Sequence, residues 1–289
     1  MNFMSRGGRP GAIILFLAFL TNATAWPALT AEKITPEEVV AKHLEAIGPA
    51  ETRDWNRSRI VSASSTINLK TGGRGVISGP ALIASHKDKV LVKAEFGSPN
   101  YPFEKFSFDG EKMRTRQYTP GVRSPLAEFF MSHNTPFSEG LIGGTLSTAW
   151  PLLHVTLRAP KLQYAGTAKI DGRQAHKLKY TPHKGGELKI TLFFDAETFH
   201  HLRTEYEQVI AAPMGENPGQ SASLREQRFK LVEDFRDFSA EDGLTLPHRY
   251  TIQYTIFRQT HPLALDWSFD LAKFTFEYPI KDDDFIVDN

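Results

Sequence analysis

The 289-residue chain contains no cysteine. That absence excludes a disulfide framework, catalysis by a thiolate and any metal site with cysteine ligands. It also excludes attachment of a lipid to an N-terminal cysteine. The formal net charge is only +1, so nothing in the charge favours binding to nucleic acid or to an anionic membrane surface. With 40% hydrophobic and 23% charged residues, the composition is that of an ordinary globular protein.

Motifs that carry catalysis or metal binding are absent as well. The sequence has no G-x-S-x-G, P-loop, G-x-G-x-x-G or H-E-x-x-H pattern. His200 and His201 are adjacent, so on a strand they point to opposite faces and do not share a metal; we expect both to be exposed. The acidic run 282–284 lacks the spacing of a calcium loop. The sequence therefore predicts no catalytic residue, no metal and no cofactor, and a protein that is not an enzyme.

Long hydrophobic runs are missing except near the N-terminus. Ala12 to Leu20, AIILFLAFL, is too short for a membrane helix, which takes about 20 apolar residues. Two arginines precede this run, and small residues follow it in an A-x-A pattern that ends at Ala25, with a looser site at Ala31. Residues 1–31 are therefore predicted to be a cleaved signal peptide, the alternative being an uncleaved anchor. We expect a periplasmic protein, since a cysteine-free exported chain suits a bacterium.

Apolar and polar residues alternate over most of the remaining chain. After the turn signal Asp171-Gly172, for example, Leu188, Ile190, Leu192 and Phe194 fall on one face of a strand. Such segments recur with turn signals between them, and no linker separates them. They predict a mainly β protein with one curved antiparallel sheet, a half-open barrel of roughly ten or eleven strands. Residues 32–289 are expected to form this single domain.

Two segments are predicted to be helical. Thr35-Pro36-Glu37-Glu38 has the pattern of a capping box with proline at the first helical position, and Gly48-Pro49 ends the helix. Residues 124–154, referred to below as the insert, break the strand pattern with short helices. Ser124-Pro125 and Thr135-Pro136 each resemble an N-cap followed by proline. We expect these short helices to cover the concave face of the sheet.

The insert has two interpretations. It contains many apolar residues, which would be plain core if the insert fills the open face of the sheet. Alternatively, it is a mobile lid over a cavity that holds lipid. We favour the lid, in which case substitutions in the insert would reduce lipid binding more than stability.

The hairpin segments also carry a family resemblance. The run DGRQAHKLKYTP, followed by LFFDAET and LR over residues 171–203, and the later run EDGLTLP over residues 241–247 are the residues concerned. They resemble the hairpin pattern of Lol-type carriers, the superfamily of outer-membrane lipoprotein-sorting proteins and related periplasmic lipid carriers. Phe199 stands where that pattern usually has glycine. The resemblance implies a non-catalytic carrier that moves a lipid or lipoprotein acyl group, with membrane-bound donor and acceptor proteins as partners and no role for nucleic acid.

The aromatic content suggests where a lipid would bind. The chain has 21 Phe, 8 Tyr and 4 Trp, more than one concave face readily hides, so we expect an apolar cavity there. The alternative function is a periplasmic sensor or interaction module that binds a peptide or a membrane regulator, which the polar loop 211–220 and an exposed strand edge would favour. The residues predicted to line the cavity or its lid are Phe96, Phe106, Phe108, Leu126, Phe129, Phe130, Met131, Leu141, Leu146, Trp150, Leu153, Leu192, Phe194, Tyr254, Trp267 and Phe269.

Overall fold

The computed structural model describes residues 34–55, 57–69, 75–210, 226–257 and 262–287. The predicted signal peptide, residues 1–31, and the loop 211–220 lie outside these ranges. Residues Ile34–Asn289 form one compact unit. Within the described ranges, no helix is both long enough and apolar enough to cross a membrane.

The described residues contain one antiparallel sheet of twelve strands. From edge to edge the order is β5-β4-β3-β2-β1-β12-β11-β10-β9-β8-β7-β6, so the sheet is open, with β5 and β6 at its two edges. Nearly all neighbours are consecutive in the chain, and the exception is the pair that joins β1 to β12. The strands are β1 (Ser58–Leu69), β2 (Gly75–His86), β3 (Lys89–Ser98), β4 (Tyr101–Phe108), β5 (Met113–Thr115), β6 (Lys161–Ile170), β7 (Arg173–Thr181), β8 (Lys189–Asp195), β9 (His201–Ile210), β10 (Gln227–Glu241), β11 (Leu244–Phe257) and β12 (Leu263–Phe276).

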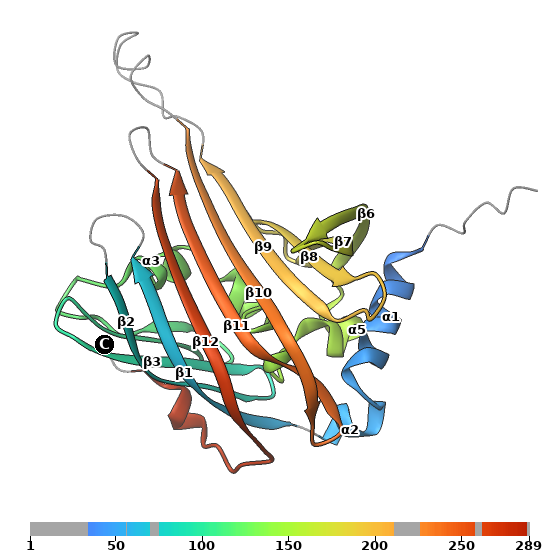
Figure 1. Ribbon diagram of the computed structural model, residues 1–289, viewed down its shortest axis with the longest axis horizontal. Helices are drawn as coiled ribbons and strands as arrows, with labels where there is room; N and C mark the ends of the chain where they lie inside the picture. The colour runs from blue at the N-terminus through green and yellow to red at the C-terminus, as the bar shows by residue number, and fades with distance from the viewer. Residues whose placement is uncertain (1–33, 56, 70–74, 211–225, 258–261, 288–289) are drawn as a thin grey trace, which may run out of the picture. The chain divides into compact units, whose positions relative to one another are not determined.

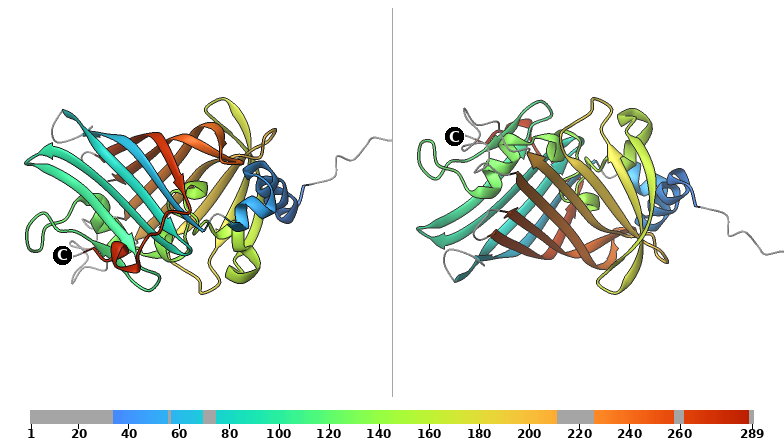
Figure 2. Two further views of the ribbon diagram at one scale, coloured as in Figure 1. Left: turned by 90° about the horizontal axis from the view of Figure 1, so that it is seen from below. Right: turned by 90° about the horizontal axis from the view of Figure 1, so that it is seen from above.

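The predicted fold class is confirmed: the protein is mainly β, and its curved sheet does not close into a barrel (Figures 1 and 2). The sheet has twelve strands where the alternation predicted roughly ten or eleven. The strand that escaped prediction is β6. Its pairing with β7 is shifted between Tyr164 and Thr167, and this irregularity interrupts the period of two on which the prediction rested.

The aspartate–glycine signals form the expected tight turns. Asp171 and Gly172, between β6 and β7, both have positive φ, at 49° and 85°. Asp242 and Gly243, between β10 and β11, do the same at 48° and 80°. Two successive left-handed residues give the turn that matches the twist of the flanking strands.

Helix α1 (Pro36–Ile47) begins as predicted. The Glu38 amide donates to Thr35 Oγ1 at 3.2 Å, and the Thr35 amide donates to Glu38 Oε2 at 2.7 Å, which completes the capping box. The helix ends at Gly48, with φ at +147°, where a Cβ atom would come within 2.7 Å of the Gly243 carbonyl oxygen. Because glycine has no Cβ atom, the end of α1 can lie this close to the turn between β10 and β11. Helix α2 (Ala50–Trp55) follows.

The insert contains α3 (Pro125–Ser132), α4 (Thr135–Ser138), η1 (Gly144–Leu146) and η2 (Pro151–His154), and α5 (Val155–Arg158) follows it. In Figure 1 these elements lie behind the sheet, against its concave face. Ser124 caps α3 as predicted, since its Oγ accepts from the Ala127 amide at 2.9 Å. The cap predicted at Thr135 is wrong by one residue, because α4 begins at Thr135 and Asn134 occupies the cap position without a side-chain hydrogen bond. The last element, η3 (Asp282–Phe285), buries Phe285.

Candidate functional site

The structure brings most of the predicted lining residues into one apolar cluster on the concave face. Fourteen of the sixteen are buried, and Leu153 packs against the same cluster while remaining partly exposed. They come from α3 and the remainder of the insert on one side, and from β3, β4, β8, β11 and β12 on the other. Whether they bind a ligand remains a prediction.

Met131 is placed elsewhere. Its side chain is 42% exposed, whereas Leu126, Phe129 and Phe130 of the same helix are buried. Positions i, i+3 and i+4 share one face of an α-helix, and position i+5 does not. Assigning Met131 to the apolar face of α3 was therefore wrong.

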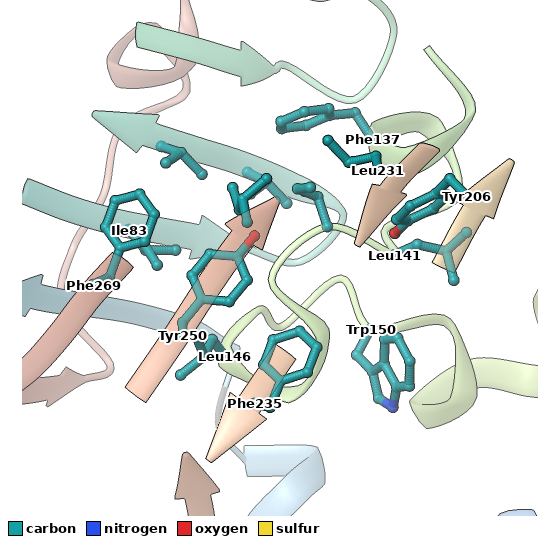
Figure 3. Close-up of a cluster of buried hydrophobic side chains, with 14 of the residues drawn as sticks. Ile83, Phe137, Leu141, Leu146, Trp150, Tyr206, Leu231, Phe235, Tyr250 and Phe269 are labelled. Carbon is teal, nitrogen blue, oxygen red and sulfur yellow. The ribbon is translucent and has the colours of Figure 1, made fainter. Parts of the chain in front are cut away.

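The insert fills the concave face with side chains. Figure 3 shows Leu141, Leu146 and Trp150 of the insert among Phe235 and Tyr250 of the sheet. These five side chains are fully buried. Phe137, Ile142 and Leu152 of the insert are fully buried as well.

A buried carboxyl group joins the insert to the middle of the sheet. Glu233, on β10, accepts hydrogen bonds from the Gly143 amide at 2.8 Å, the Tyr206 hydroxyl at 2.6 Å and the Tyr250 hydroxyl at 2.5 Å. Burial raises the pKa of Glu233 to about 7, against the opposing effect of the three donors, and nearby Asp234 raises it further. The sequence held a signal for this residue, since Leu231, Glu233 and Phe235 alternate on one face of β10.

Gly144 fits this position because it has no side chain. Its φ is +50°, and a Cβ atom would lie 2.7 Å from His201 Nδ1 and 2.9 Å from Phe235 Cζ. Both neighbours are ring atoms of fully buried side chains, so neither can withdraw easily. The turn of the insert therefore packs directly against side chains of β9 and β10.

Gly144→Ala is expected to lower the free energy of unfolding by about 2–5 kcal/mol, because left-handed backbone costs about 1–2 kcal/mol and overpacking costs about 1–3 kcal/mol. Denaturant unfolding measures this loss. Gly172→Ala is the matched control, since Gly172 also has positive φ, at +85°, but a Cβ atom there would meet nothing within 4 Å. The control should lose only about 1–2 kcal/mol. Equal losses in both variants would contradict tight seating of the insert.

Two histidines and a tryptophan form a second buried cluster. Trp150 Nε1 donates to His43 Nε2 at 3.0 Å, and the Trp150 ring stacks on His201 with centroids 4.5 Å apart. Burial lowers the pKa of His43 to about 3 and that of His201 well below its usual value, so both rings are neutral at pH 7. Helical spacing could have identified His43, because it lies on the apolar face of α1 with Val40 and Ile47.

The expectation that both adjacent histidines are exposed is wrong. His201 is fully buried on the concave side, and its Nε2 lies 3.0 Å from the Arg203 carbonyl oxygen and 2.9 Å from Thr204 Oγ1. His200 stacks on Phe238, with centroids 4.4 Å apart. An aromatic pocket accommodates the buried ring, and the alternation of residues does not reveal such a pocket.

The start of the insert is attached through a second buried carboxyl group. Ser124 Oγ donates to Glu104 Oε2 at 2.7 Å, and the Tyr101 hydroxyl donates to Glu104 Oε1. Burial raises the pKa of Glu104 to about 7. The insert is thus held at its first residue and at its central turn by carboxyl groups of the sheet.

Phe199 stands where the Lol-type hairpin pattern usually has glycine, and its backbone keeps the conformation that glycine favours. Its φ is +57°, the left-handed conformation that glycine adopts more readily. The His43 ring nitrogen Nδ1 hydrogen-bonds its carbonyl oxygen at 2.9 Å, and its ring stacks on His176 with centroids 5.5 Å apart. These contacts hold the strained residue in place and link α1 to the turn before β9.

The chemistry of this site is that of apolar contact. Most of its polar groups hydrogen-bond one another or the backbone, whereas His201 Nδ1 and Trp267 Nε1 have no hydrogen-bond partner within the described ranges. Among the described residues, no three His, Asp or Glu side chains are grouped so that they could hold a metal ion.

No protein-family model and no curated protein matches the chain. Among solved structures it is similar to a protein described as an outer membrane lipoprotein-sorting domain, from Vibrio parahaemolyticus, with 11% identity, coverage of 86% of this chain and 94% of that one, and a TM-score of 0.47. It is also similar to a LolA superfamily protein from Nitrosomonas europaea, with 11% identity, coverage of 88% and 99%, and a TM-score of 0.47. A DUF1329 family protein from Desulfovibrio piger has 12% identity, coverage of 86% and 96%, and a TM-score of 0.45.

Proposed function

We propose that this chain is a non-catalytic periplasmic protein that binds one acyl chain of a lipid or lipoprotein on the concave face of its sheet. The insert occupies that face in the ligand-free form and moves aside when the ligand enters. The proposal rests on one observation: a segment of short helices covers the concave face, where a further layer of regular secondary structure could have covered it.

The short helices favour a cover that can be displaced. After α3, the helical elements of the insert are three or four residues long. Isolated helices of this length have no stability of their own, so the insert depends on contacts with the sheet. An acyl chain offers the sheet the same kind of contact, worth about 0.8 kcal/mol for each buried CH₂ group.

Competition between insert and ligand would make the binding reversible. The apparent affinity is the intrinsic affinity multiplied by the fraction of molecules in which the concave face is accessible, so closure of the insert lowers it. A membrane-bound donor would supply the acyl chain, and release would require an acceptor that binds it more favourably. Export after removal of residues 1–31 would place the carrier between the two.

The first test is a search for bound lipid. Protein purified from its exporting host is expected to release a lipid or acylated peptide that mass spectrometry detects, and N-terminal sequencing of the same sample should begin after Ala25 or Ala31. After the lipid is removed, the protein should bind a dansyl-labelled fatty acid. Absence of lipid from the native preparation, together with no binding of the fatty acid, would refute the proposal.

A matched pair of variants locates the acyl chain. Leu146 is buried in the insert, and Leu202 is buried in a separate cluster with Ile170, Ala175 and Phe193. Both changes to alanine should destabilise the protein by about 2–5 kcal/mol. Only Leu146→Ala should raise the affinity for the fatty acid, because it weakens the closed insert. Equal affinities in the two variants would contradict competition between the insert and the ligand for the concave face.

The sensor alternative depends on an exposed strand edge. Strand β6 does form one edge of the sheet, but its pairing is irregular between Tyr164 and Thr167, where Gly166 has φ at +82°. Irregularities of this kind protect sheet edges from pairing with another chain. The loop 211–220, which would also favour a sensor, lies outside the described residues. We therefore keep the carrier as the proposed function.

A further inference from the structure

A cleft of about 680 Å³ opens at the end of the insert. Its walls are α2, the turn between β2 and β3, and the segment that runs from Thr148 through α5. Four cationic side chains line it, against two carboxylates, which gives the lining a balance of two positive charges. The cations are Arg53, Arg57, Lys87 and Arg158, and the carboxylates are Asp54 and Asp88.

The cations of the cleft have few partners. Among the described residues, none of the four forms a salt bridge within 4.0 Å. Arg158 donates to the Ser138 carbonyl oxygen at 2.8 Å, and Arg57 donates to the Asp54 carbonyl oxygen at 3.4 Å. Arg53 Nε is buried and has no hydrogen-bond partner in the described part of the chain. A buried donor without a partner is costly, so this group is suited to an anionic ligand.

A fifth cation, Arg59, is buried next to the cleft. Arg59 is only 4% exposed, and its Nη1 donates to the Thr145 carbonyl oxygen of the insert at 2.6 Å. Its Nε has no hydrogen-bond partner within the described ranges. Burial lowers the pKa of Arg59 to about 10, so the group stays charged at neutral pH. A gap of about 10 Å³ lined by Arg53, Arg59, Trp150 and Leu153 shares two residues with the cleft.

The cleft also has an apolar wall. Ala149, Leu153 and Leu157 line it, and Leu157 is 85% exposed. A wall of three apolar side chains beside a group of cations fits a ligand that is part apolar and part anionic better than it fits a free ion.

We propose that the cleft binds the anionic group, a phosphate or a carboxylate, of an amphiphile whose apolar chain runs past Leu153 toward the concave face. Guanidinium groups match the oxygens of phosphate and carboxylate in pairs, and lysine adds a point charge. The inference rests on the proposed function, because it assigns a head group to the ligand whose acyl chain the concave face would hold.

The test compares three probes on the delipidated full chain by calorimetric titration. Dodecyl phosphate has the apolar chain and the anion, tri(ethylene glycol) monododecyl ether has the same chain with an uncharged head, and inorganic phosphate has the anion alone. The parent should bind dodecyl phosphate about tenfold more tightly than the uncharged ether. Inorganic phosphate should compete only at concentrations about a hundredfold higher.

The double variant Arg53→Gln/Lys87→Gln should lose about tenfold in affinity for dodecyl phosphate and change less than about twofold toward the ether. Lys169→Gln/Lys179→Gln is the matched control, since both of its lysines are exposed on β6 and β7 outside the cleft and its charge loss is the same. It should retain the parent's preference. Thermal unfolding of each variant confirms that it is folded.

The outcomes separate the two proposals. Equal binding of dodecyl phosphate and ether, unchanged in the cleft variant, would overturn the head-group site and leave acyl-chain binding in place. Failure of the parent to bind either amphiphile would overturn the proposed function itself. Displacement of dodecyl phosphate by inorganic phosphate at similar concentrations would show a site for a free anion and refute the amphiphile.

Discussion

Trp150→Ala is expected to lower the free energy of unfolding by about 3–5 kcal/mol, the usual loss when a buried aromatic side chain is removed. Trp150 is fully buried, stacks on His201 and donates its Nε1 proton to His43. The variant therefore loses apolar contact and leaves a buried ring nitrogen of His43 without its donor. Urea unfolding followed by circular dichroism measures the change.

Trp150→Phe separates the two contributions. Phenylalanine retains much of the ring contact and removes the hydrogen bond to His43, so its loss should be smaller, about 1–3 kcal/mol. From the sequence, a lid over an empty or lipid-filled volume predicted a small loss even for alanine. The packing of the insert now predicts the large one. A loss below about 1.5 kcal/mol for Trp150→Ala would mean that the insert opens while the sheet stays folded.

Glu233→Gln is expected to change how stability depends on pH. Because burial raises its pKa from 4.5 to about 7, Glu233 stays protonated in the folded chain over a range where the unfolded chain ionises it. The folded state then binds more protons, so stability falls as pH rises from about 4.5 to about 7. The loss for this residue is on the order of 3 kcal/mol. The variant cannot ionise, so its stability relative to the parent should rise by that amount between pH 5 and pH 8.

The comparison must be a difference between variant and parent, because buried histidines act in the opposite direction. The lowered pKa of His43, about 3, means that stability falls as pH drops below its usual value of 6.5. Glu45→Gln, on the exposed surface of α1, is the matched control. Parallel pH profiles for the parent and Glu233→Gln would show that Glu233 ionises normally in the folded protein.

Much of the local structure was predictable because it depends on neighbours in the sequence. The Thr35 capping box involves residues three positions apart, and the Asp171-Gly172 turn needs only two residues that tolerate positive φ. The period of two identified which side chains of β8 share a face, including Leu192 and Phe194. Met131 was misplaced because one hydrophobic run was assigned to one face without regard to the helical period.

The candidate site was predictable only in part. The sequence predicted that residues 124–154 are an apolar insert. It also predicted most of the apolar residues, from the strands and from the insert, that pack together on the concave face. It did not identify Glu233, Glu104, His43 or His201 as buried, because a polar side chain is buried only when distant residues supply its partners. The cations around the cleft were missed for the same reason, since Arg53, Lys87 and Arg158 meet only in the folded chain.

The sequence by itself determined the fold class, the hairpin turns and the segment that interrupts the strands. These features follow from alternation, turn residues and caps, which act over a few residues. Only the tertiary structure decided that β1 pairs with β12, that Trp150 reaches His43 across 107 residues, and that Gly143 reaches Glu233 across 90. Such pairings depend on which distant segments approach one another. A pattern of faces does not specify that choice, because any apolar face can pack against any other of the same shape.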